Sequence, residues 1–131
     1  WIRSEYNHQE LELRVDANGA FSASDALQKL QQLSKYNLHS IEQPIASNQW
    51  EEMAQLCSNS PIPIALDEEL IGLNESQLLN MMETINPQYI ILKPSLLGGL
   101  EMCDKIIEMA EKKKIRWFID VPIGLDIRSG C

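Results

Sequence analysis

The sequence predicts an α/β fold in which a parallel sheet is covered by helices. Short apolar runs that are typical of strands alternate with segments of helical period, five of the former and four of the latter. The unit recurs about every 26 residues, and no linker or low-complexity stretch divides the chain. Strands that alternate with helices of this length join through right-handed crossovers, which makes the sheet parallel.

The strands are nearly continuous in apolar residues, as expected when helices cover the sheet. In chain order they are expected at 11–15, 38–41, 62–66, 89–92 and 115–119. The helices between them are expected at 22–36, 48–57, 76–85 and 99–113. Ser22 or Ser24 is expected to cap the first helix and Asn48 the second, because short polar side chains accept the free N–H groups there. The basic run 112–114 ends the last helix, where cations complement the dipole.

Composition sets limits on function. The chain has 131 residues, a net charge of −8 and 44% hydrophobic residues. This length and composition are typical of a single globular domain. The acidic balance argues against nucleic acid, which needs clustered Lys and Arg. No apolar run approaches the ~20 residues of a membrane helix, and the N-terminus does not read as a signal peptide. Three cysteines without a Cys-x-x-Cys pattern read as reduced thiols of a cytoplasmic protein.

Four ionisable residues occupy matching places in the repeat. Asp16, Glu42, Asp67 and Lys93 each follow an apolar run, at intervals of 26, 25 and 26 residues. The carboxyl ends of parallel strands lie along one edge of the sheet, and neighbouring strands are ~5 Å apart. We therefore expect the three carboxylates to converge, with the lysine beside them.

Three uncompensated carboxylates at such distances repel one another, and a divalent cation removes the conflict. Oxygen ligands on rigid strands suit Mg²⁺, which keeps positions open for substrate. A metal with a lysine across from it can promote removal of a proton from the carbon next to a carboxylate. The expected ligands are Asp16, Glu42 and Asp67, with Lys93 as the catalytic residue.

Each residue alone also fits a simpler role: Asp16 a turn, Glu42 or Lys93 a solvated strand end, and Asp67 a helix N-terminus. Their shared register favours the joint site. An alternative of another class is a Mg²⁺-binding receiver-like signalling domain, which is also acidic and α/β. That class requires two adjacent acids after the first strand and the Lys-Pro after the fifth, and this chain has neither.

Four motifs carry a family resemblance: LRVDANGAF, HSIEQPI, IALDEEL and ILKPSLLGG. Together they resemble the enolase superfamily, in its muconate-lactonising-enzyme-like subgroup, and the last is most similar to the o-succinylbenzoate synthase family. The resemblance implies that residues 1–119 are central βα units of a (β/α)₈ TIM-type barrel domain. It implies Mg²⁺ on Asp16, Glu42 and Asp67, with Lys93 over the other face of the substrate and Asn18 and Glu68 supporting the ligands.

The implied reaction is a syn dehydration of a cyclohexadiene carboxylate through an enediolate, in menaquinone synthesis. The partner is thus a small-molecule carboxylate, and oligomerisation of the parent is left open. Dipeptide epimerase or N-acylamino-acid racemase activity on the same barrel is the alternative.

Two departures separate the chain from that family. The family's Lys-x-Lys strand, which carries the acid/base, has no counterpart before Asp16, since Arg3 and Arg14 do not fit. Residues 120–131 are atypical, and an out-of-frame origin is our hypothesis for them. We expect the chain alone to be inactive. We also expect it to be aggregated, molten or oligomeric, because open sheet edges and side chains such as Val15, Ile41 and Leu66 would lack partners.

Overall fold

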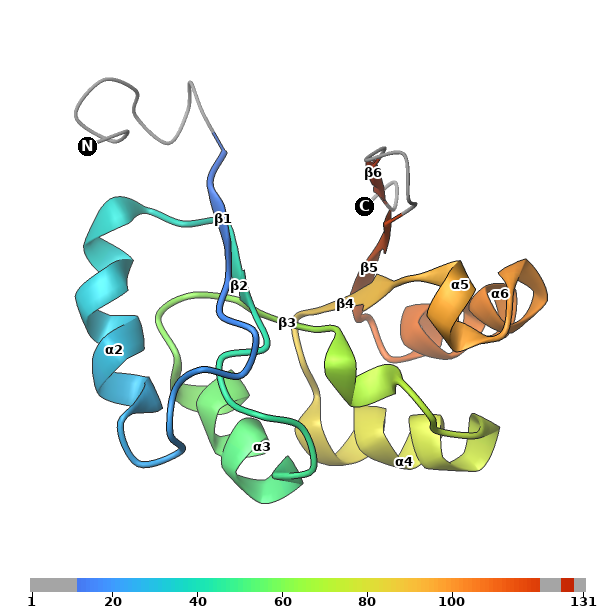
Figure 1. The fold of residues 1–131 in the computed structure, drawn as a ribbon, viewed down its shortest axis with the longest axis horizontal. Coiled ribbons are helices and arrows are strands. Elements are labelled where there is room, and N and C mark those ends of the chain that lie inside the picture. Colours follow the sequence, from blue (N-terminus) through green and yellow to red (C-terminus); the bar gives the residue numbers. More distant parts are fainter. Residues whose placement is uncertain (1–11, 121–125, 129–131) are drawn as a thin grey trace.

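A computed structural model describes residues 12–120 and 126–128, which form one curved sheet lined on one side by helices (Figure 1). The strand order is β1-β2-β3-β4-β5-β6. Strands β1 to β5 are parallel and follow one another along the sheet, which confirms the expected part of a barrel. The order excludes the receiver-like alternative, which requires the order 2-1-3-4-5 and helices on both faces.

The strands are shorter than the apolar runs that predicted them. Their bounds are β1 Arg14–Asp16, β2 Ser40–Glu42, β3 Ile64–Leu66, β4 Tyr89–Leu92, β5 Arg116–Asp120 and β6 Asp126–Arg128. The final strand was not expected, and it pairs antiparallel with β5. The rest of the atypical tail, 121–125 and 129–131, lies outside the described residues.

The four expected helices are present, with a further short one after β4. Their bounds are α2 Ala26–Leu33, α3 Trp50–Asn59, α4 Glu75–Ile85, α5 Pro94–Leu97 and α6 Leu100–Lys112. Two 3₁₀ turns, η1 Ser34–Tyr36 and η2 Glu68–Leu70, complete the described elements. Pro94 begins α5 because its fixed φ suits a first helical position. Gly98 and Gly99, at φ 93° and 101°, form the tight turn between α5 and α6.

The expected caps were wrong for two helices. The N-cap of α2 is Asp25 and that of α3 is Gln49, and neither side chain makes a capping bond. Asn48 instead has a φ of 70°, the left-handed region that asparagine tolerates in turns. The Oγ of Ser22 still accepts a hydrogen bond from the Asp25 N–H at 3.3 Å, one residue before the helix begins.

The apolar core lies between the sheet and the helices. Ile41, Leu66 and Met81 are fully buried in it, and Val15 packs against it while partly exposed. The expectation that Ile41 and Leu66 lack partners is therefore wrong. Both alternate to the helix side of the sheet, whose packing does not depend on further strands.

The concave face carries the other half of each strand. Ala65, Tyr89, Ile91 and Phe118 form a small separate cluster there. The Arg14 guanidinium lies over the Phe118 ring, 4.3 Å from its centroid, although β1 and β5 are not neighbours in the sheet. The sheet therefore curves far enough for its first and fifth strands to meet across the concave side.

Across the described ranges, no helix has the length and apolar character that crossing a membrane requires. Cys57 and Cys103 are buried and free, which confirms reduced thiols for these two. Cys131 lies outside the described residues.

Candidate metal centre

Three carboxylates meet at the carboxyl ends of β1, β2 and β3. Asp16 and Glu42 end their strands opposite each other in register, and Asp67 directly follows β3. One carboxylate oxygen from each of the three lies within 4.8 Å of the other two. The convergence expected from the spacing is confirmed, and the donor set consists of the carboxylate oxygens that a hard divalent cation prefers.

Lys93 stands on the next strand end and faces the same group. Its Nζ donates to Oδ2 of Asp67 at 2.6 Å, and the Asp67 side chain is 4% exposed. This contact raises the pKa of Lys93, against the opposing effect of burial. The lysine therefore neutralises one of the three carboxylates in the metal-free protein.

Asp120 continues the series and was missed. It ends β5, 27 residues after Lys93, but sequence reasoning assigned it to the atypical tail. Its charge contributes to the raised pKa of Lys93. The repeat could have identified it, because the next interval after Lys93 ends near Asp120.

The site holds more negative than positive charge, and burial makes this imbalance costly. Burial, followed by the charge of Asp16 and a hydrogen bond with it, raises the pKa of Glu42 to about 8. Burial also raises the pKa of Glu68, whose Oε2 is buried without a hydrogen-bond partner. A proton or a cation must be held here at neutral pH, since three ionised carboxylates cannot remain this close.

Asn18 supports the first carboxylate. Its backbone N–H donates to Oδ1 of Asp16 at 2.9 Å, in a turn where Asn18 has a φ of 50°. With its side-chain amide oriented to satisfy both groups, Nδ2 also lies 3.2 Å from each oxygen of Asp16. Glu68 lies beside Asp67 at the start of η2.

Two buried polar residues behind the carboxylates were not singled out by sequence reasoning. Gln43 is 1% exposed and Glu69 is 3% exposed. Gln43 Nε2 donates to Glu69 Oε1 at 3.2 Å, and Glu69 Oε2 accepts from Trp50 Nε1 at 3.1 Å. The sequence offered only a weak signal, because an acid after Asp67-Glu68 reads as a solvated helix start.

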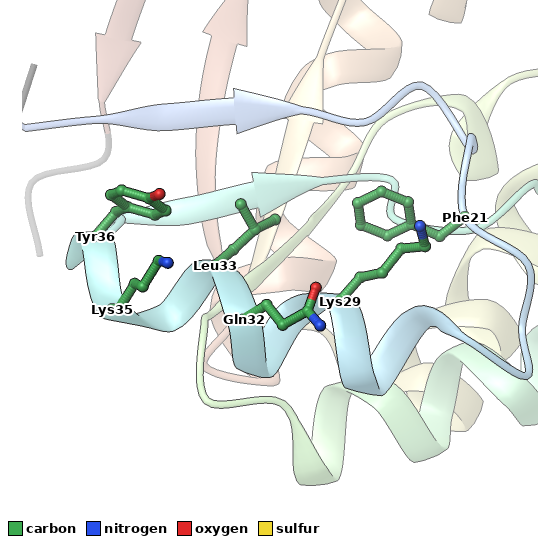
Figure 2. Close-up of a pocket in the computed structure, with 6 residues that line it drawn as sticks. All are labelled: Phe21, Lys29, Gln32, Leu33, Lys35 and Tyr36. Atoms are coloured by element: carbon green, nitrogen blue, oxygen red, sulfur yellow. The ribbon is translucent and has the colours of Figure 1, made fainter. Parts of the chain in front are cut away.

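A separate pocket of about 340 Å³ lies against α2 and contains none of the carboxylates. Figure 2 shows the residues that line it: Phe21, Lys29, Gln32, Leu33, Lys35 and Tyr36. The Lys29 ammonium lies 5.5 Å from the Phe21 ring centroid, a cation–π distance. The pocket lining has no carboxylate, thiol or imidazole, so it does not contribute to the cluster of carboxylates at the strand ends.

Several proteins of known name are similar to this chain in sequence and in fold. The chain is 58% identical, over 90% of its length, to the o-succinylbenzoate synthase of Desulfotalea psychrophila, and covers 32% of that protein. The crystal structure of MenC from the same species has a TM-score of 0.91 at 56% identity, covering 93% of this chain and 34% of that one. A dipeptide epimerase of Enterococcus faecalis has a TM-score of 0.84 at 25% identity, covering 95% and 35%.

The chain thus spans about a third of the length of these relatives. Residues 1–129 match the model of one domain family, described as enolase C-terminal domain-like. The half-barrel fold and the acidic strand ends agree with that match. The chain therefore belongs to the enolase C-terminal domain-like family.

Proposed function

We propose that the chain is part of a Mg²⁺-dependent lyase, an o-succinylbenzoate synthase of menaquinone biosynthesis. The observation that carries the proposal is the convergence of Asp16, Glu42 and Asp67 within 4.8 Å, beside Lys93. The chain is 58% identical to a synthase named for this reaction, whereas it is 25% identical to the dipeptide epimerase among its structural relatives. The higher identity favours the synthase reaction. Residues 1–119 would be central βα units of the barrel.

The three carboxylates would hold the Mg²⁺, and Asn18 and Glu68 would support them. The donor set fits, because it consists of carboxylate oxygens and the adjacent Glu68 Oε2 is buried and unpartnered. When bound, the cation supplies positive charge beside the carboxylate of a small-molecule substrate.

Lys93 would act on the substrate directly as a cation. Once a metal neutralises Asp67, the ammonium no longer serves that carboxylate alone and can face the substrate. There it would stabilise the negative charge that develops when the carbon next to the substrate carboxylate loses its proton. Loss of that proton and of a hydroxyl group from one face gives water and 2-succinylbenzoate. The proton acceptor would be the second lysine of the family's Lys-x-Lys strand.

The test is a chimera in which residues 12–120 replace the matching segment of the Desulfotalea synthase. We expect Mg²⁺-dependent conversion of the cyclohexadiene carboxylate, and a loss of about 100-fold or more in kcat with Asp67→Asn. Dipeptide epimerisation without dehydration would favour the alternative activity. A folded chimera that catalyses neither of these reactions would refute an enzymatic role for these residues.

A further inference from the structure

The buried pair Gln43–Glu69 sits directly behind the carboxylates and is tied to each of the strand ends that carry them. Gln43 Oε1 accepts from the backbone N–H of Asp67 at 3.2 Å. The Gln43 carbonyl accepts from the Gly19 N–H at 2.7 Å, three residues after Asp16. Glu42 is the preceding residue in the chain. One residue therefore links all three ligand positions.

Glu69 fixes the other end of Gln43. Its Oε1 accepts from Gln43 Nε2, and its Oε2 accepts from Asn48 N at 2.8 Å and from Trp50 Nε1 at 3.1 Å. Gln43 Nε2 also donates to the Ile45 carbonyl at 3.0 Å. The amide of Gln43 is thus held by partners on both sides, and its orientation is determined.

The backbone at Gln43 needs this support. Its φ is 41°, in the left-handed region that side chains other than glycine rarely adopt. The chain turns there directly after Glu42, so the direction of the Glu42 side chain depends on the turn being held. Space is also tight, since a Cβ at Gly19 would lie 3.0 Å from the Ala46 backbone.

We propose that Gln43 and Glu69 are positioning residues, a buried hydrogen-bonded pair that holds the carboxylates of Glu42 and Asp67 at the separation that binds the cation. The inference rests on the proposed function, because it concerns the same metal centre. Neither side chain touches the substrate space, since both are buried behind the strand ends. Their effect on the reaction is exerted through Glu42 and Asp67.

The experiment measures Mn²⁺ binding to the full chain by the paramagnetic resonance of the free ion, and thermal unfolding in chelator. Gln43→Met and Glu69→Gln keep the side-chain shapes and are expected to weaken Mn²⁺ binding about 10- to 100-fold. The exposed Gln55→Met and Glu52→Gln are the matched controls and should bind like the parent. The reciprocal exchange, Gln43→Glu with Glu69→Gln, preserves the pair's contact with Asp67 and should recover part of the affinity.

The variant Met81→Ala tests for a merely structural role, because Met81 is a fully buried core residue of α4 and not a member of the hydrogen-bonded pair. If Met81→Ala lowers the Tm as much as Gln43→Met does but leaves Mn²⁺ affinity unchanged, positioning is supported. Parent-like affinity in Gln43→Met would overturn the proposal, and if that variant does not fold, parent-like affinity in Glu69→Gln would do so. Equal Mn²⁺ affinity in the parent and in Asp67→Asn would instead overturn the metal centre itself.

Discussion

Metal binding should release a proton from Glu42, and its affinity should rise with pH. Burial and the neighbouring Asp16 raise the pKa of Glu42 to about 8, so the metal-free protein holds a proton there at neutral pH. A cation binds the ionised form and must displace that proton. With a pKa near 8, ~0.9 proton leaves at pH 7 and ~0.1 at pH 9. The affinity for Mg²⁺ should rise ~10-fold per unit below pH 8 and level off above it.

The same shift sets the pH dependence of folding without metal. Because the pKa of Glu42 is raised on folding, the folded state binds more protons than the unfolded state between pH 4.5 and about 8. Stability is therefore highest below pH 4.5 as far as this group is concerned, and it is lost as the pH rises to 8. The full shift corresponds to ~5 kcal/mol. Solvent screening of the partly exposed Glu42 reduces the expected loss to ~1–2 kcal/mol.

Titration calorimetry with Mg²⁺ in two buffers of different ionisation enthalpy counts the protons released at each pH. Thermal unfolding in chelator from pH 5 to pH 9 follows the stability, with Glu42→Gln as the control in which the pH dependence should flatten. If Mg²⁺ affinity is constant between pH 6.5 and 7.5 and no proton is released, the electrostatic account of the site is wrong.

Three further predictions concern packing, the ion pair and the open edge. Met81→Ala empties a fully buried position and should lower the free energy of unfolding by ~2–5 kcal/mol, whereas Leu79→Ala, 40% exposed, should change little in the same denaturant titration. Lys93→Met leaves the Asp67 carboxylate buried without its partner and should destabilise the chain by ~1–3 kcal/mol. Added Mg²⁺ should remove most of that loss in thermal unfolding, and an unchanged loss would argue that the cation does not reach Asp67. The chain 1–131 should self-associate in light scattering, through the sheet edges that β1 and β6 present among the described strands, and it should show no dehydratase turnover. A monomer, or activity near that of the full-length relatives, would contradict these expectations.

The parts of the fold that depend on local pattern could be predicted from the sequence. Apolar runs and their spacing located β1 to β5, and the repeat aligned Asp16, Glu42 and Asp67 because parallel strands in register bring equivalent positions to one edge. Caps were harder, since the N-cap of α3 is set by the tertiary course of the loop and not by the polar residue available at Asn48.

Gln43 and Glu69 could not be identified in advance for a related reason. Both are polar and lie after strand ends, where side chains are usually solvated. Their burial arises only when the loops after β2 and β3 fold over each other, a contact between residues 26 positions apart. The face to which Ile41 and Leu66 point was also misjudged, because a continuous apolar run does not show which alternate residues meet the helices.

The reversed strand β6 has a consequence for how copies of this chain can meet. By pairing with Phe118, Ile119 and Asp120, it occupies the edge of β5 that a further parallel strand would use. Among the described strands, the two outer edges of the sheet are those of β1 and β6. A strand that runs parallel to β5 cannot add to β5 while β6 is paired there, so the sheet cannot continue as a barrel on that side. Copies of this chain should therefore associate through the edges of β1 and β6, and such pairing does not rebuild the barrel.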